Sequence, residues 1–208
     1  MAKLPRPPSP AALRRIDPVW RWVRARTLLW RVYFRAGAHP GTWNGFRSFG
    51  PLASARFDHH IPPPHVQDRR VCYAASEIQT CLAEVFQEGH HIDRAYRDPW
   101  LVGFELTRDL RLLDLAGAWP TRAGTSMNIN SGPRSRARSW SAAIYEAYLD
   151  AEGLWYASSM HANRPAIALY ERAEDALPGH PVVHRPLADP ALLLPLQRAA
   201  ADLNYILT

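Results

Sequence analysis

Five residues spread along the chain have types that could do chemistry together: Arg31, Arg56, Tyr73, Glu84 and Ser158. A carboxylate such as Glu84 can stabilise the positive charge that develops on a sugar when a glycosidic bond is cleaved. Guanidinium groups give planar, bidentate hydrogen bonds to phosphate oxygens, and an electron-rich tyrosine ring can stack on a cation. A serine hydroxyl can both donate and accept hydrogen bonds. Together these groups suit a substrate with a pyrophosphate, a ribose and a positively charged leaving group.

Glu84 follows a short apolar stretch that is predicted to be a buried strand turning directly into a helix. Ser76-Glu77-Ile78-Gln79 has the Ser-x-x-Gln form of a capping box, which predicts where this helix begins. An apolar stripe then follows at helical spacing: Ile78, Cys81, Leu82, Val85 and Phe86. Glu84 lies off this stripe, roughly 130° from its centre. It therefore faces either water or a crevice beside the end of the strand.

The other elements must position the remaining candidates. Strands are predicted from aromatic and β-branched runs, at residues 27–34, 71–75, 101–106, 111–115, 154–158 and 166–170. Of these, 101–106 and 111–115 read as a strand pair. Helices are predicted from residue 78, over 140–151, and from 189 with an interruption at Pro195. Helices and strands do not alternate regularly, which indicates an α+β fold with a mixed β-sheet core and flanking helices.

Length and composition indicate one domain with additions at both ends. The 208 residues are 47% hydrophobic, enough for a single well-formed core. We expect residues 1–26 to be an N-terminal extension outside the core, 27–174 the main domain, and 175–208 a C-terminal helical element. No apolar run is long enough to cross a membrane and no secretory signal is present, so a cytoplasmic protein is expected.

The distribution of charge, cysteine and histidine along the chain argues against nucleic-acid, disulfide and metal sites. The net charge of +6 is scattered along the chain, which does not favour direct nucleic-acid binding. Cys72 and Cys81 are expected to be buried thiols and not a disulfide or metal pair. The histidines at 59, 60, 65, 90 and 91 lack the cysteine or carboxylate partners of a tetrahedral site, so no metal is expected. No Gly-x-Ser-x-Gly, GxGxxG or Walker A sequence is present.

The order and spacing of the five candidates resemble the RES-domain family. The supporting stretches are Leu29-Trp30-Arg31-Val32, Arg56-Phe57, Tyr73 followed by Glu84 eleven residues later, and Gly153-Leu154-Trp155-Tyr156-Ala157-Ser158. The resemblance covers roughly residues 27–174. The chain departs from the family pattern in having Ala55-Arg56-Phe57 where Gly-Arg-Trp is usual, and in the His- and Pro-rich insert 58–70, which is left open as a lining of the site.

The resemblance implies a fold similar to that of diphtheria-toxin-type ADP-ribosyltransferases and an enzyme that consumes NAD. It implies catalytic roles for Glu84, Arg31 and Arg56, and NAD binding by Tyr73 and Ser158 with the same two arginines. NAD would be a substrate, with inorganic phosphate as a candidate co-substrate and no other cofactor. Family members act as toxins of toxin–antitoxin pairs, so a helix-turn-helix antitoxin of the Xre type is the implied partner; a homodimer is left open.

Three functions are compatible with these features. The first is cleavage of the nicotinamide–ribose bond of NAD by phosphate or water, as a NAD phosphorylase or glycohydrolase, with ADP-ribosyl transfer to a protein as its variant. The second is a basic nucleic-acid-binding or RNA-cleaving protein. The third is an interaction module that binds a partner through the Trp-containing N-terminal segment. We expect the first.

Overall fold

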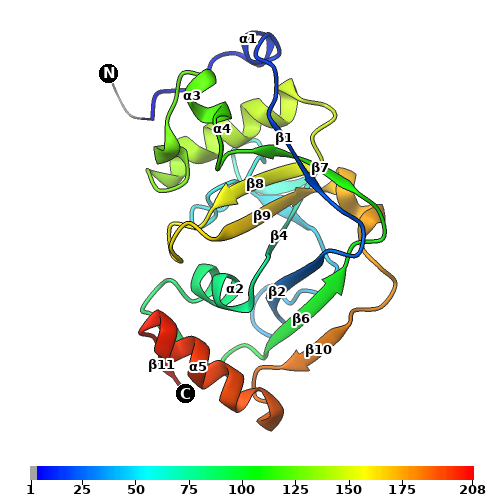
Figure 1. Cartoon of the computed structure of the whole chain (residues 1–208), viewed down its shortest axis with the longest axis vertical. Coiled ribbons are helices and arrows are strands. Elements are labelled where there is room, and N and C mark those ends of the chain that lie inside the picture. The colour runs from blue at the N-terminus through cyan, green and yellow to red at the C-terminus, as the bar shows by residue number, and fades with distance from the viewer. Residues whose placement is uncertain (1–3) are drawn as a thin grey trace.

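A computed structural model describes residues 4–208, and its centre is a nine-stranded sheet (Figure 1). The order of the strands is β1-β7-β8-β9-β4-β2-β6-β10, with β3 paired to β4. The strands are β1 (Trp20–Val23), β2 (Leu28–Phe34), β3 (Arg47–Gly50), β4 (His65–Ala75), β6 (Pro99–Glu105), β7 (Leu110–Asp114), β8 (Gly153–Ala157), β9 (Pro165–Tyr170) and β10 (Val183–Pro186). β7 and β8 are parallel, and the other pairs are antiparallel.

Helices flank this sheet, which confirms the predicted α+β class with a mixed sheet. The α-helices are α1 (Pro10–Leu13), α2 (Ile78–Val85), α3 (Trp119–Arg122), α4 (Arg134–Ala147) and α5 (Leu193–Leu203). Short 3-10 turns are η1 (Met127–Ile129), η2 (Glu171–Ala176) and η3 (Pro190–Leu192). A separate parallel pair joins β5 (His91–Ile92) to β11 (Ile206–Leu207). No helix within the described residues is long and apolar enough to span a membrane.

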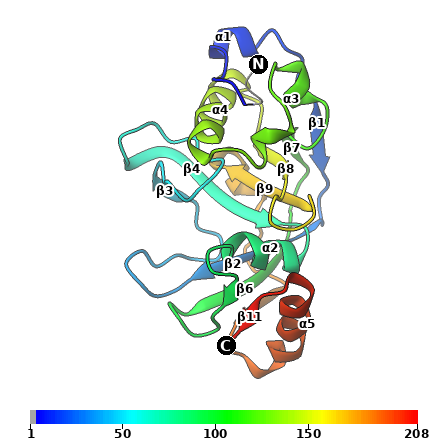
Figure 2. The same cartoon turned by 90° about the vertical axis from the view of Figure 1, so that its left-hand side faces the viewer.

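The sheet has two halves that meet at β4. In Figures 1 and 2, α1, α3 and α4 lie with β1, β7, β8 and β9 at one end, and α2 and α5 lie with β2, β6 and β10 at the other. β4 pairs with β9 over five residues but with β2 only where Trp30 faces Ala75. The sheet is therefore narrowest beside the end of β4, which is where α2 begins.

Two bent stretches of chain, residues 20–34 and 99–114, also connect the two halves of the sheet. Val23 faces Leu110 in the β1–β7 pair, and Leu28 faces Glu105 in the β2–β6 pair, so the antiparallel register is the same on both sides of the bend. Asp109 holds the bend by accepting the Arg24 guanidinium at 2.6 Å and the backbone N–H of residue 25 at 2.8 Å.

This continuity corrects the prediction that 101–106 and 111–115 pair with each other. Both segments are strands, but they follow one another along one bent stretch of chain and pair with 28–34 and 20–23 instead. The short connection between these two segments contains polar residues, as a hairpin turn does. Here it is a bend, because the partner segments before and after residues 24–27 are already in register.

The ends of the chain also differ from the predicted extensions. Residues 20–23 form a strand of the sheet, and Leu13 is fully buried, so part of segment 1–26 belongs to the core. In segment 175–208, β10 extends the sheet beside β6, and α5 packs near α2. Pro195 does not interrupt α5, since it lies in the first turn, where a proline removes no helical hydrogen bond.

Candidate active site

The turn that leads from β4 into α2 is fastened to the neighbouring strand. β4 ends at Ala75, and α2 begins at Ile78 with Glu77 as an N-cap that makes no side-chain capping bond. The Ser76 hydroxyl instead donates to the carbonyl of Pro165 at 3.3 Å. The capping box predicted the start of the helix correctly, but its hydrogen bonds are not formed. The reason is that the Ser76 side chain binds β9 and does not cap α2.

Glu84 lies in the last turn of α2 and faces the end of β8. Its Oε1 accepts a hydrogen bond from Ser158 Oγ at 2.5 Å, and Ser158 is fully buried directly after β8. Ser158 Oγ in turn accepts the backbone N–H of Met160 at 3.2 Å. Of the two orientations that the sequence left open for Glu84, the structure shows the one against the strand end, and the side chain is only partly exposed.

Two guanidinium groups are held beside Glu84 by uncharged acceptors. Arg56 donates from Nη1 to the carbonyl of Gly132 at 2.5 Å. Arg134 donates from Nη2 to Oε1 of Gln87, and Gln87 Nε2 donates to the backbone carbonyl of Glu84 at 2.6 Å. Within residues 4–208, neither Arg56 nor Arg134 has a carboxylate oxygen within 4 Å. The ion pairs that the described residues form are made by other side chains, most of them arginines.

These three charges influence one another. Burial raises the pKa of Glu84, and the Ser158 hydrogen bond and the positive charges of Arg56 and Arg134 only partly offset that rise. Burial and the charge of Arg134 lower the pKa of Arg56, while Glu84 acts in the opposite direction. The arrangement can therefore place a carboxylate against a developing cation and present two guanidiniums to an anion.

Two tyrosines line the same region. The hydroxyl of Tyr73 is buried and has no hydrogen-bond partner among the described residues. Tyr156 is 4% exposed, and its ring packs at 4.7 Å from the ring of Phe57, the neighbour of Arg56. Burial raises the pKa of both tyrosines, and the charge of Glu84 adds to the rise, so both hydroxyls are neutral donors near this carboxylate.

Tyr156 and Arg134 belong to this region although they were not among the residues predicted from the sequence. Tyr156 had a signal, because it precedes Ser158 by two residues on a strand, and alternate residues of a strand share a face. Arg134 had none: it lies at the end of the segment 119–138, which has the composition of a long loop and which in fact contains α3, η1 and the start of α4.

Arg31 is held by contacts that involve none of the other candidates. Its Nη1 donates to the carbonyls of Trp43 and Gly45, at 3.0 and 2.9 Å, and contacts Cys72 Sγ at 2.8 Å. No hydrogen bond or ion pair links it to Arg56, Tyr73, Glu84 or Ser158 in the part of the chain that the structure describes. All three contacts of Arg31 use Nη1, and they fasten the segment 43–45 to β2 and β4. Cys72 and Cys81 are free and buried, as predicted.

The first residues of the insert 58–70 lie inside the protein. Asp58, His59 and His60 are almost completely buried. Burial alone would raise the pKa of Asp58, but the hydrogen bond with His60 and the charge of Arg47 hold it far below its usual range. The negative charge of Asp58 also raises the pKa of Tyr73, so Asp58 lies near this tyrosine.

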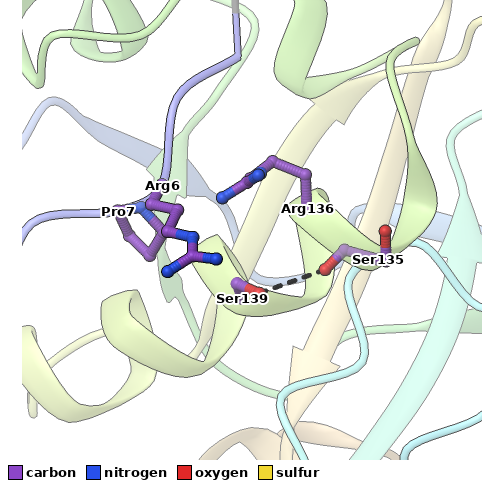
Figure 3. Close-up of a pocket in the computed structure, with 5 residues that line it drawn as sticks. All are labelled: Arg6, Pro7, Ser135, Arg136 and Ser139. Atoms are coloured by element: carbon purple, nitrogen blue, oxygen red, sulfur yellow. Dashed lines mark hydrogen bonds between the residues drawn. The ribbon is translucent and has the colours of Figure 1, made fainter.

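Neither the described histidines nor the hollow beside α4 includes the predicted site residues in a second chemical centre. Over residues 4–208, no group of three His, Cys, Asp or Glu side chains is arranged to hold a metal ion. A shallow hollow of about 520 Å³ lies between the N-terminal segment and α4, lined by Arg6, Pro7, Ser135, Arg136 and Ser139 (Figure 3). None of the five predicted site residues lines it.

Comparison with known proteins identifies the family. A model of the RES domain matches residues 28–196. A chain of the M. tuberculosis MbcT–MbcA toxin–antitoxin complex is similar in structure, with a TM-score of 0.56 at 18% identity over 86% of this chain and 92% of that chain. That likeness shows a shared fold. No curated protein matches the sequence. Because the RES model covers most of the sheet and all five candidate positions, the chain belongs to the RES-domain family.

Proposed function

We propose that this protein is a toxin that cleaves the bond between nicotinamide and ribose in NAD. The observation that carries the proposal is the partly buried Glu84, held by Ser158 and flanked by two arginines without carboxylate partners. NAD offers the matching groups: a cationic nicotinamide ribose for the carboxylate and a dianionic pyrophosphate for the guanidiniums. The RES family and the toxin–antitoxin context of the structural relative support the same choice.

Each side chain then has a definite role. Ionised Glu84 stabilises the oxocarbenium character of the ribose as the C1′–N bond breaks. Ser158 orients Glu84 and lowers its pKa toward the ionised form. Tyr73 supplies a ring for the nicotinamide. Arg56 and Arg31 bind the pyrophosphate, Arg31 through the Nε and Nη2 that its loop contacts do not use.

The reaction needs no general acid. As the C1′–N bond breaks, its electron pair leaves with nicotinamide, which departs as a neutral ring. An oxygen of inorganic phosphate or of water forms the new bond to C1′; water loses a proton to the solvent, whereas phosphate loses none. The leading assignment is therefore a NAD phosphorylase or glycohydrolase. ADP-ribosyl transfer to a protein is the alternative that uses the same carboxylate.

The cellular setting is part of the proposal. We propose that the protein acts in the cytoplasm, and the structural relative comes from a toxin–antitoxin complex. We propose a cognate antitoxin with a helix-turn-helix domain of the Xre type. Induced expression of the chain should arrest growth, and co-expression of a neighbouring helix-turn-helix gene should relieve the arrest.

Nicotinamide release tests the chemistry directly. The purified protein is incubated with NAD, with and without inorganic phosphate, and products are separated by chromatography. Phosphate-dependent release indicates phosphorolysis, and phosphate-independent release indicates hydrolysis. Glu88→Gln, at an exposed position just after α2, is the matched control for Glu84→Gln. Equal release by the Glu84→Gln variant and the parent would refute the assignment. Salt-sensitive binding to random RNA with no effect on NAD would favour the nucleic-acid alternative.

A further inference from the structure

Arg134 is one of the two arginines that flank Glu84, and the group that it binds has still to be assigned. It is anchored to Gln87, and Gln87 is anchored to the backbone of Glu84, so α2 and the start of α4 are joined across the site. Arg56 reaches the same place from another segment, because it donates to Gly132, two residues before Arg134. Both guanidiniums are thus fixed to one short segment beside the carboxylate.

The two positive charges of this pair are only partly neutralised, by the single carboxylate of Glu84. Arg56 and Arg134 are bound by a carbonyl and an amide oxygen, which orient a guanidinium but carry no negative charge. Some arginines elsewhere in the chain are instead paired to carboxylates, as Arg69 is to Glu146 at 2.8 Å. Like charges held near each other in a half-buried site cost free energy unless an anion occupies the space between them.

The side-chain charges at the start of α4 are unfavourable for the dipole of this helix. The N-terminal end of a helix carries partial positive charge and is stabilised by acidic or hydroxyl-bearing residues. Here the N-cap is Pro133, no side chain caps the helix, and the first turn holds no acidic residue. Arg134 and Arg136 occupy that turn instead. Cations at the positive end of a fourteen-residue helix lower the stability of that helix. Sequence choices that lower local stability in this way occur at functional sites.

We infer that Arg134 and Arg56, with Gln87 as the residue that positions Arg134, form a phosphate-binding subsite beside Glu84. This inference rests on the proposed function and adds to it the location where a phosphoryl group binds. Two sources share the chemistry: the pyrophosphate of NAD and the inorganic phosphate that attacks C1′. A guanidinium that donates through Nη2 to Gln87 still has donors for a phosphate oxygen.

Steady-state kinetics with NAD and inorganic phosphate varied separately distinguish the two sources. In Arg134→Gln, we expect the KM for one substrate to rise about tenfold or more, consistent with the loss of a charge-assisted hydrogen bond. A rise confined to phosphate assigns the subsite to the attacking anion, and a rise confined to NAD assigns it to the pyrophosphate. Arg134→Lys should recover part of the affinity, because it keeps the charge without the planar fork.

Matched variants separate binding from folding. Arg136→Gln removes a cation from the same turn of α4, in the hollow of Figure 3, and should leave both KM values within about twofold. Gln87→Leu should raise the same KM as Arg134→Gln while kcat changes less, since it frees Arg134 without removing it. Unchanged KM values in Arg134→Gln, or equal changes in Arg136→Gln, would overturn the subsite.

Direct binding keeps the subsite testable if the parent does not cleave NAD. Calorimetric titration with inorganic phosphate and with pyrophosphate should show binding to the parent that weakens about tenfold or more in Arg134→Gln. No binding to the parent, or equal binding to both proteins, would refute the subsite. Binding that depends on Arg134, without nicotinamide release, would refute the proposed reaction and leave the subsite in place.

Discussion

Glu84 meets two conflicting requirements. Catalysis requires the ionised carboxylate next to Ser158, whereas burial favours the protonated form and raises its pKa. A group with a raised pKa in the folded state contributes its stability below its unfolded pKa, and that contribution is lost as the pH rises through the folded pKa. At neutral pH the ionised Glu84 side chain therefore lowers the free energy of unfolding, but the reaction needs this ionised form.

Glu84→Gln should consequently inactivate and stabilise the protein at once. Gln keeps the size of the side chain and an acceptor for Ser158 but removes the charge. We expect nicotinamide release to fall by about a hundredfold or more, and Tm to rise at pH 7 by about 2–4 °C, the equivalent of about 1 kcal/mol for a domain of this size. Melting curves at pH 7 and pH 4 check the cause, because the difference should disappear at pH 4. An equal difference at both values would contradict it.

Tyr73→Phe tests the unpartnered hydroxyl. In the folded protein the Tyr73 hydroxyl is buried without a partner among the described residues, so its removal should leave the free energy of unfolding unchanged or raise it by about 1 kcal/mol. Urea denaturation measures this effect. Because the ring that stacks on nicotinamide is kept and the hydroxyl is buried, the KM for NAD should change little in the same variant. Tyr145→Phe is the contrast, since that hydroxyl donates to Glu171 at 2.5 Å, and its removal should destabilise the fold.

At the scale of elements, the site depends on how tightly β8 packs against β9. Gly153 begins β8, and a Cβ at this position would overlap the backbone oxygen of Ala168 and lie 3.0 Å from the Cα of Leu169. Backbone atoms cannot move aside as a flexible side chain can. Glycine is therefore required by close approach, and it sets the path of the strand that ends in Ser158.

Gly153→Ala should separate β8 from β9. We expect a loss of about 1–3 kcal/mol in the free energy of unfolding, as for overpacked positions in a protein core. The Glu84–Ser158 hydrogen bond should weaken with it, so nicotinamide release should fall even under conditions where the variant remains folded. Gly179→Ala is the control, because nothing lies within 4 Å of a Cβ there. Denaturation and activity measured on both variants decide the matter.

For the whole molecule, several buried groups make stability depend on pH in one direction. Burial alone would raise the pKa of Glu171, but His59, the Tyr145 hydroxyl and the backbone N–H of Arg70 together lower it to about 2. The pKa of Asp58 is lowered by His60 and Arg47 against its burial, and burial lowers the pKa of His59. The unfolded chain therefore binds protons at these three groups more readily than the folded protein.

Stability should accordingly fall on acidification. Groups with a lowered folded pKa contribute stability above their unfolded pKa and lose it as the pH falls. His59 should begin the loss near pH 6.5, and the carboxylates should continue it from about 4.5 towards 2, with Glu171 alone contributing on the order of 3 kcal/mol. Urea midpoints from pH 8 to pH 3 measure this. In Glu171→Gln the acidic limb should flatten, whereas exposed Glu174→Gln should leave it unchanged; a flat parent profile would refute the account.

The sequence by itself determined most of the elements and the family. Hydrophobic periodicity placed α2 and the strands at 28–34, 153–157 and 165–170 within one or two residues, and the eleven-residue interval between Tyr73 and Glu84 marked the family. These features are local, because each depends on residues within a few turns of helix or positions of a strand. The class of fold followed from their order along the chain.

Only the tertiary structure decided which way the side chains face and what surrounds them. The choice between water and the end of β8 for Glu84, the contact of Arg31 with Cys72, and the presence of Arg134 all depend on segments far apart in sequence. The pairing of 20–34 with 99–114 likewise joins distant segments, so no local pattern could distinguish its bend from a hairpin. Burial and neighbouring charge set the pKa of Glu84, and both exist only when the halves of the sheet are assembled around it.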